Sequence, residues 1–179
     1  MDLRRPVTAA TLAAIKAAFL AHKVLVFRDQ QGLSADAQKA LGAHFGDFAL
    51  HPFRAPIDGH PELLGIAKEA DEQINVGGGW HTDMTFLEAP PLGSLLYALQ
   101  LPPAGLGDTL FANVESAYCA LTPGLRRVLD GLSAVHSAER VHGPAAVQDQ
   151  SEFRKRAAQQ ALAGAAVCHP VVPIGRAHV

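Results

Sequence analysis

The sequence predicts an α+β domain with a mainly antiparallel sheet, and three features of its pattern support this class. Helical patterns gather at the start of the chain and in one later block, whereas short apolar or β-branched runs lie between loops. The order lacks the regular strand–helix alternation of a doubly wound fold. No glycine-rich phosphate loop follows a predicted strand, because Gly77-Gly78-Gly79 does not have the spacing of a nucleotide fingerprint. Without a linker or internal repeat, residues 1–179 are expected to form a single domain.

The first part of the chain predicts two helices on either side of a buried strand. Apolar side chains recur every third or fourth position over residues 8–22, and Thr8 can cap the start of that helix. Residues 24–27 form a short apolar, β-branched run that is typical of a buried strand. A second helix is expected over residues 34–45, between a capping serine and a terminating glycine.

The middle of the chain predicts loops with short strands, a setting in which binding residues are often found. Prolines and glycines divide residues 47–80 into loops around one expected strand at Leu63–Ala67. A further strand is expected over residues 94–100, and a pair of prolines closes it. Residues 109–112 predict another short strand.

The remaining residues predict a helical block followed by strands around one more helix. An asparagine is placed to cap a helix over residues 114–121, and a proline begins the next helix, over residues 123–130. Strands are expected over residues 132–136 and 166–172. Between them, a serine is placed to cap a charged helix over residues 151–163.

Composition and charge argue against several classes of protein. The net charge is −2 with a pI near 6.5, and basic residues form no stripe, so no nucleic-acid partner is expected. No apolar run reaches the roughly 18 to 20 residues that cross a bilayer, so no membrane partner is expected. Cys119 and Cys168 lie far apart without a Cys-x-x-Cys spacing, which predicts reduced, buried thiols in a cytoplasmic protein.

The candidate site is a histidine and an aspartate two residues apart, His81 and Asp83, directly after a glycine run and Trp80. On an extended chain, residues two apart point to the same side, so an imidazole and a carboxylate would face one metal ion together. One further histidine would complete the facial triad of iron(II) oxygenases, which leaves three coordination positions open. The spacing alone is weak evidence for a metal site, because it more often marks a loop histidine that is hydrogen-bonded to a nearby carboxylate.

The surroundings of this pair carry a more specific signal than the pair itself, because short segments follow one another in a fixed order over almost the whole chain. They are VLVFRDQ (24–30), FGD (45–47), HP (51–52), WHTDMTF (80–86), PP (90–91), GDTLF (107–111), AY (117–118) and HPVV (169–172). In this order, and with similar gaps, they resemble the taurine dioxygenase family, which includes the 2,4-dichlorophenoxyacetate dioxygenases.

This resemblance implies a fold, a reaction and roles for named residues. The fold would be a double-stranded β-helix (jelly roll) with flanking helices. The enzyme would be an iron(II)- and 2-oxoglutarate-dependent dioxygenase that uses O2 to hydroxylate a small, anionic, taurine- or sulfonate-like substrate, with succinate and CO2 as co-products. His81 and Asp83 match two iron ligands. Thr109 matches a threonine that holds the distal carboxylate of 2-oxoglutarate, and His51 matches a histidine that contacts the substrate sulfonate.

Some of these residues also have an ordinary structural interpretation, and others depart from the family pattern. By pattern alone, Thr109 is a β-branched strand residue and His51 a hydrogen-bonded loop histidine. Arg54 stands where the taurine enzymes have tyrosine, and it can pair with an anionic substrate or be solvated. Gly77 stands where they have asparagine, so a sulfonate pocket is not implied. The remaining motif residues are expected to be packing or structural residues: Trp80 and Phe86 around the site, and His169.

The family continues beyond the HPVV segment, where it carries a distal iron-binding histidine and an arginine that grips 2-oxoglutarate. His178 and Arg176 are not at the matching positions, so these roles are not carried over to them. We therefore expect a partial domain, incomplete at its C-terminus, that is poorly active as an isolated chain. The alternatives are a catalytically silent remnant that binds metal weakly, or a zinc hydrolase or non-enzymatic binding module, which the ordered match disfavours. Self-association into a homo-oligomer is left open.

Overall fold

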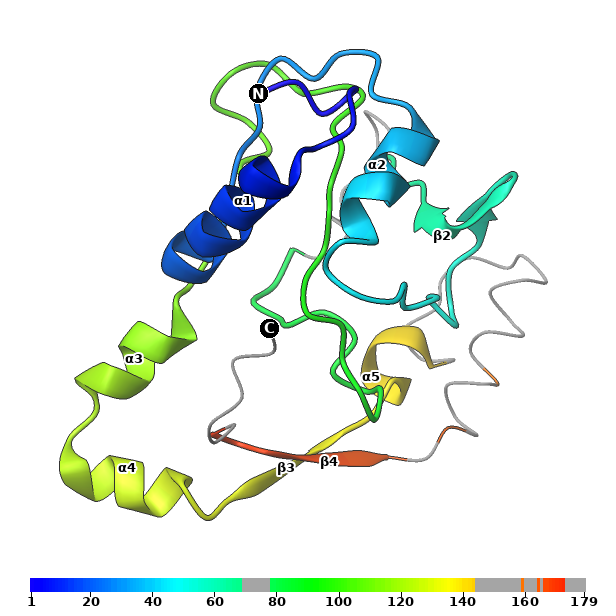
Figure 1. Cartoon of the computed structure of the whole chain (residues 1–179). Coiled ribbons are helices and arrows are strands. Elements are labelled where there is room, and N and C mark those ends of the chain that lie inside the picture. The colour runs from blue at the N-terminus through cyan, green and yellow to red at the C-terminus, as the bar shows by residue number, and fades with distance from the viewer. Residues whose placement is uncertain (69–77, 144–158, 160–163, 165, 173–179) are drawn as a thin grey trace. The chain divides into compact units, whose positions relative to one another are not determined.

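The chain, in the computed structural model of Figure 1, divides into two compact units, each built from two separate stretches of sequence. Unit 1 combines Met1–Gly46 with Ser94–Gly131, and unit 2 combines Asp47–Gly93 with Leu132–Val179. The structure describes residues 1–68, 78–143, 159, 164 and 166–172. Because the stretches of the two units alternate along the chain, residues that are distant in sequence come together within each unit.

The described helices of unit 1 are α1 (Ala9–His22), α2 (Ala35–Gly42), α3 (Val114–Ala120) and α4 (Pro123–Leu129) (Figure 1). Each begins behind a side-chain oxygen that accepts a hydrogen bond from a backbone N–H three residues ahead, an arrangement that contributes about 1 kcal/mol per helix. The capping residues are Thr8, Ser34, Asn113 and Thr122, with donor–acceptor distances of 3.0 to 3.3 Å. These helices confirm the predictions, although α2 ends at Gly42, before a tight turn that reaches Phe45.

The core of unit 1 forms around Leu3, Ile15 and Leu41, which are all buried. Partly buried hydrophobic side chains pack against this core: Val7, Leu25, Phe27, Leu33 and Phe45. Burying such a side chain contributes about 1.5–3 kcal/mol. The core therefore joins α1 and α2 to the residues that precede and separate them.

Gln30 is a buried polar residue that ties the N-terminal residues of unit 1 to this core. Its Oε1 atom accepts a hydrogen bond from the Leu3 N–H at 2.8 Å. Its Nε2 atom donates to the carbonyl oxygens of Met1 and Arg28, at 2.9 and 2.6 Å. The side chain thus satisfies three backbone groups that come from two parts of the chain.

The strands predicted over residues 24–27, 94–100 and 109–112 of unit 1 are wrong, because these segments are irregular in the structure. A strand needs a neighbouring strand for its backbone N–H and C=O groups, and no strand among the described residues pairs with them. In residues 24–27, alternate side chains pack on the core, so the apolar pattern reflects one-sided burial. Residues 94–100 are bound to α2 by a side chain instead of a strand, because the Gln38 Nε2 donates to the Leu95 carbonyl at 3.1 Å.

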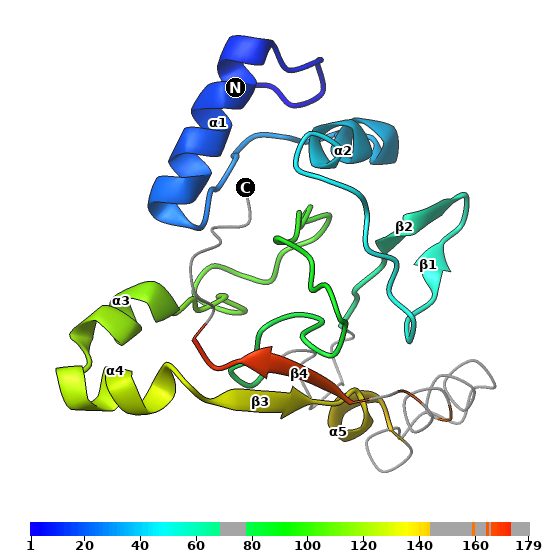
Figure 2. The same ribbon diagram turned by 60° about the horizontal axis from the view of Figure 1, so that its bottom comes forward.

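Unit 2 contains two antiparallel strand pairs and a short helix among its described residues. The elements are β1 (Pro56–Ile57) with β2 (His60–Leu64), β3 (Ser133–His136) with β4 (Val167–Pro170), and α5 (Glu139–His142). Figure 2 shows β3 and β4 running alongside one another, and their register opposes Ala134 to His169 and His136 to Val167. His136 and His169 therefore lie on the same face of this pair. The strands predicted over residues 132–136 and 166–172 are confirmed.

The first strand pair of unit 2 differs from the sequence prediction. The strand expected at Leu63–Ala67 is found at earlier residues, because β2 runs from His60 to Leu64. Its partner β1 is not predicted, although the Asp58-Gly59 dipeptide between the strands is frequent in hairpin turns. The helix predicted over residues 151–163 lies outside the described residues. Helices and small antiparallel pairs thus occur together, as the α+β class requires.

Both cysteines are free and exposed, so the expectation of buried thiols is wrong. Cys168 faces outward because burial alternates along β4, and α3, which carries Cys119, has no buried residue. In the part of the chain that the structure describes, no helix combines the length and the apolar character that a membrane span needs.

Candidate metal centre

His81 and Asp83 lie in unit 2, between β2 and β3, with their side chains facing each other. The His81 Nε2 atom is 3.3 Å from the Asp83 Oδ1 atom, and the two side chains are 53% and 61% exposed. The prediction that the side chains point to the same side is therefore confirmed. Their exposure makes both groups accessible to an ion from solvent.

The backbone of Gly79 fixes the orientation and the tautomer of the His81 ring. The His81 Nδ1 atom is 2.8 Å from the Gly79 carbonyl oxygen, which can only accept a hydrogen bond, so Nδ1 carries the hydrogen. In the neutral ring, Nε2 then presents a lone pair toward the Asp83 carboxylate. These two electron-rich groups repel each other unless a cation or a proton lies between them. Metal-binding histidines commonly have this arrangement, in which the second ring N–H donates to a carbonyl.

The distance between the two candidate ligand atoms allows both of them to bind one divalent cation. An ion about 2.1 Å from each atom would make an angle of roughly 104° with them, which lies between the angles of an octahedron and a tetrahedron. An imidazole nitrogen and a carboxylate oxygen are donors of the iron(II) facial triad. Within the described residues, no third histidine, cysteine, aspartate or glutamate completes a cluster with the pair. Three other residues of the sequence analysis lie outside the described residues: Gly77, Arg176 and His178.

The residues that follow Asp83 form a tight turn. Met84 has a φ of 51°, in the left-handed region that residues other than glycine rarely adopt. The Leu87 N–H donates to the Met84 carbonyl oxygen at 3.0 Å, which closes the turn. The position of Asp83 is therefore coupled to the conformation of the residues just after it.

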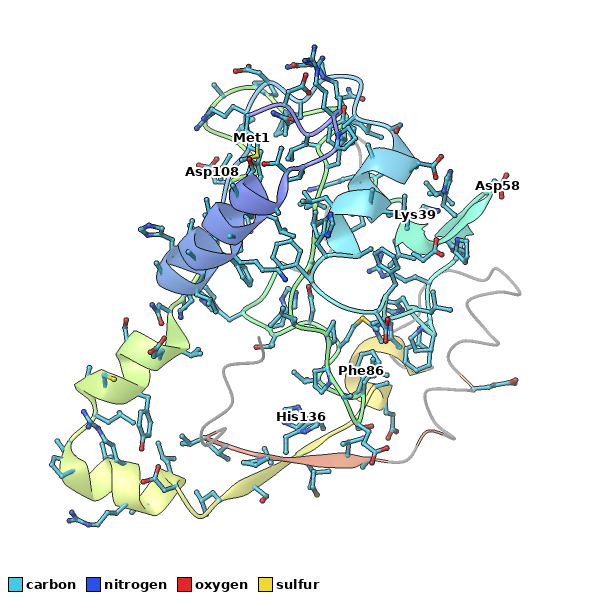
Figure 3. The ribbon with its side chains drawn as sticks, viewed as in Figure 1. Met1, Lys39, Asp58, Phe86, Asp108 and His136 are labelled. Atoms are coloured by element: carbon cyan, nitrogen blue, oxygen red, sulfur yellow. The ribbon has the colours of Figure 1, made fainter. Side chains whose placement is uncertain are left out.

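Two histidines of the β3–β4 pair bind this turn. The His136 Nδ1 atom, on β3, is 2.9 Å from the Thr85 Oγ1 atom. The His169 Nε2 atom, on β4, is 3.0 Å from the carbonyl oxygens of both Thr85 and Leu87. Figure 3 labels His136 on β3 and Phe86, the residue between the two carbonyls. These contacts agree with the structural role predicted for His169.

His51, the predicted substrate residue, is half-buried in a cluster of rings in unit 2. Its ring centroid lies 6.2 Å from that of Phe53, 6.3 Å from that of Phe86 and 5.3 Å from that of His142. Phe53 and Ala138 are the buried core of this unit, and Phe86 packs against them. Phe86 thus packs as predicted, and His51 is held in an apolar environment.

Burial and two charged neighbours set the protonation state of His51, and a backbone N–H sets its tautomer. The Phe53 N–H donates to the His51 Nδ1 atom at 3.1 Å, so in the neutral ring the hydrogen is on Nε2. Burial lowers the pKa of His51 below its ordinary value of 6.5, and the positive charge of Arg54 lowers it further, whereas the Asp83 carboxylate raises it. At neutral pH the ring is uncharged, and it lies within electrostatic reach of both Arg54 and Asp83.

Thr109, the predicted 2-oxoglutarate residue, lies in an exposed loop of unit 1. The loop depends on Gly107, which has a φ of 70° and where an added Cβ would lie 2.8 Å from the Pro102 Cγ atom. A turn closes just before it, because the Leu106 N–H donates to the Pro103 carbonyl at 3.1 Å. Thr109 thus belongs to a different unit from the candidate ligands, and its role stays a prediction.

Near the pair, the prediction for Trp80 is wrong, and the sequence analysis misses two residues, Thr85 and His136. Trp80 is 73% exposed and does not pack around the site, because residues 78–83 are all exposed. Thr85 is not singled out, although its place in the WHTDMTF segment is a usable signal. His136 is also missed, and its only signal is its place in a predicted strand.

Comparisons with known proteins show what this chain is similar to. Residues 1–174 match a family model described as "Taurine catabolism dioxygenase TauD, TfdA family". An alpha-ketoglutarate-dependent sulfate ester dioxygenase of Pseudomonas putida is 40% identical over 131 residues, which cover 73% of this chain and 42% of that protein. An alkylsulfatase of Acinetobacter baylyi is 37% identical over 143 residues, which cover 80% of this chain and 44% of that protein.

Similarity extends to a further relative and to a solved structure. The alpha-ketoglutarate-dependent 2,4-dichlorophenoxyacetate dioxygenase of Cupriavidus pinatubonensis is 31% identical over 156 residues, or 77% of this chain and 53% of that protein. A crystal structure from Burkholderia xenovorans, assigned as an alpha-ketoglutarate-dependent taurine dioxygenase, superposes with a TM-score of 0.62 at 33% identity. The superposition covers 76% of this chain and 49% of that one. The chain spans about half the length of the relatives it matches.

Proposed function

The chain belongs to the TauD/TfdA family of dioxygenases, and from this premise we propose that it acts as an iron(II)- and 2-oxoglutarate-dependent dioxygenase. The observation that carries the proposal is the 3.3 Å separation between His81 Nε2 and Asp83 Oδ1. A nitrogen and a carboxylate oxygen at this distance offer two adjacent positions to an iron(II) ion. The proposed reaction uses O2 and 2-oxoglutarate, hydroxylates a small organic anion, and gives succinate and CO2.

In the proposed centre, His81 and Asp83 would bind the iron, and the hydrogen bond to the Gly79 carbonyl orients the neutral His81 ring so that its Nε2 lone pair is directed at the ion. When bound, iron(II) supplies the chemistry that activates O2. The chain's own residues bind and orient the organic reactants. Thr109 is proposed to hold the distal carboxylate of 2-oxoglutarate through its hydroxyl group.

The proposed substrate class is a sulfate ester or a sulfonate. Two of the relatives are named a sulfate ester dioxygenase and an alkylsulfatase. The neutral His51 ring offers an Nε2–H donor, and the Arg54 guanidinium is close enough to lower the pKa of that ring. Both are donors that suit an anionic oxygen group. Because the charge of Asp83 acts on the same ring, an anion held by His51 would lie near the metal pair.

Both units are proposed to belong to one jelly-roll domain, the fold that the family resemblance implies. The family match spans residues 1–174, which include all of unit 1 and residues 47–93 and 132–174 of unit 2. The strand pairs β1–β2 and β3–β4 would be parts of its antiparallel sheets. Two free cysteines agree with the cytoplasmic location that is proposed with it.

The test measures succinate formed from 2-oxoglutarate in the presence of iron(II), ascorbate and O2, with an alkyl sulfate ester, a taurine-like sulfonate or 2,4-dichlorophenoxyacetate as substrate. Because the isolated chain is expected to be poorly active, we expect a sulfate ester or a sulfonate to raise its succinate formation only slightly above the substrate-free rate. His81→Ala should abolish this increase, whereas His44→Ala, at an exposed histidine of unit 1, should preserve it. Substrate-dependent turnover that survives His81→Ala would contradict the metal role, and iron-loaded wild type without any turnover would contradict the activity.

A further inference from the structure

We propose that His136 and His169 are positioning residues for the candidate metal centre, because they hold the turn that follows Asp83 and so set the place of that ligand. The inference rests on the proposed function, since it concerns the same site. His136 and His169 would then do more than stabilise the β3–β4 strands. Three contacts on the turn carry it.

His169 binds the backbone of the turn on both sides of Phe86. Its Nε2 atom is 3.0 Å from the Thr85 carbonyl oxygen and 3.0 Å from the Leu87 carbonyl oxygen. Both partners can only accept, so Nε2 carries the hydrogen and shares it between them. A donor shared by the carbonyls of Thr85 and Leu87 holds both groups toward one point and so restricts the conformation of the turn.

His136 approaches the same turn through a side chain. Its Nδ1 atom is 2.9 Å from the Thr85 Oγ1 atom. The two histidine rings share one face of the β3–β4 pair, with their centroids 5.2 Å apart at an angle of 62°. Thr85 is thus held by its hydroxyl group from β3 and by its carbonyl group from β4 (Figure 3 shows the His136 ring beside the ribbon of β3).

The turn needs such contacts because its backbone is strained beside the ligand. Met84, between Asp83 and Thr85, has a φ of 51°, which residues other than glycine rarely adopt. His81 and Asp83 are themselves more than half exposed, so their own packing restrains them little. The anchored end of the segment is therefore Thr85 to Leu87, one residue beyond the strained position. Releasing that end would let Asp83 move away from the His81 Nε2 atom.

A purely structural role for the histidines would leave ion binding by the folded chain unchanged, and this difference makes the inference testable. The probe is Co2+, titrated into the 179-residue chain while the fluorescence of Trp80 is followed. Trp80 is the single tryptophan of the chain and directly precedes His81, so quenching of its fluorescence reports an ion bound by His81 and Asp83. Circular dichroism shows that each variant is folded at the temperature of the titration.

The first pair of variants is His169→Leu, which removes the donor, and His169→Gln, whose amide offers two N–H groups to the two carbonyls. We expect His169→Leu to weaken Co2+ binding by about tenfold, the lower end of the range for residues that orient metal ligands. His169→Gln should recover most of that loss. The second pair, Thr85→Val and Thr85→Ser, removes or keeps the hydroxyl group that contacts His136, and only the valine variant should bind more weakly.

The outcomes separate this inference from the proposed function. Equal dissociation constants for wild type and a folded His169→Leu variant would overturn the inference and leave the metal site standing. If His169→Leu does not fold, the Thr85 pair decides, and equal constants for valine and serine would overturn it. A wild-type chain that binds no Co2+ would contradict the proposed metal site itself, and the inference with it.

Discussion

Replacing Asp83 with asparagine tests the metal pair directly, because the change removes one negative charge and keeps the shape of the side chain. The Asp83 Oδ1 atom lies 3.3 Å from the His81 Nε2 atom, so a bound dication would touch both. An amide oxygen is a weaker ligand than a carboxylate oxygen, because it carries only a partial charge. The variant should therefore bind Co2+ more weakly while its fold is unchanged.

The size of this effect follows from the geometry and the exposure of Asp83. Its side chain is 61% exposed, so the dielectric constant of water is appropriate. A dication about 2.1 Å from a carboxylate oxygen is then attracted by about 4 kcal/mol. Displaced hydration water offsets part of this attraction, which leaves about 2 kcal/mol, or roughly 30-fold weaker binding.

Isothermal titration calorimetry with Co2+, at fixed pH and ionic strength, measures the change. The matched control is Asp58→Asn, at the β1–β2 turn of the same unit (labelled in Figure 3), which removes the same net charge from an exposed residue that is not a candidate ligand. The control should bind as wild type does, because salt screens distant exposed charges. An unchanged dissociation constant for Asp83→Asn would refute the assignment of Asp83 as a ligand. Equal losses of Co2+ affinity in both variants would show that the effect comes from net charge alone.

Three further changes test the scaffold. Gln30→Met breaks three hydrogen bonds to backbone groups, so urea unfolding should show a loss of about 2–3 kcal/mol, whereas the exposed Gln31→Met should change little. Gly107→Ala places a Cβ at a φ of 70° and should cost about 1–2 kcal/mol, whereas Gly131→Ala, in open space, should not, and equal unfolding midpoints would contradict this. Burial lowers the pKa of His51, so its NMR titration should have a midpoint below 6.5. As the pH falls below 6.5, the unfolded chain takes up this proton first, so stability falls there, and His51→Gln should remove that part of the pH dependence.

The helices could be predicted from the sequence because their signals are local. Thr8, Ser34 and Asn113 each accept a hydrogen bond from a backbone N–H only three residues ahead. A strand has no such signal, because its backbone partners come from elsewhere in the chain. Residues 94–100 and 109–112 therefore have the composition of strands without pairing in the described structure.

The candidate site divides in the same way. The sequence predicts the convergence of His81 and Asp83 from their two-residue spacing, and the structure places their side chains in contact. The contact between His169 and Thr85 joins residues that are 84 positions apart, and no pattern near either one announces it. Sequence reasoning therefore identifies the groups that would meet an ion but not the residues that hold them in place.

The long sequence distance between the candidate ligands, His81 and Asp83, and His169 also has a consequence for the nascent chain. Leu87 precedes His169 by 82 positions, so the two cannot meet until synthesis has passed that interval. At ordinary elongation rates of roughly 5–20 residues per second, this takes about 4 to 16 s. His81 and Asp83 are therefore synthesised before the strands that carry His136 and His169. A metal ion can therefore reach the pair before the contacts from His136 and His169 form.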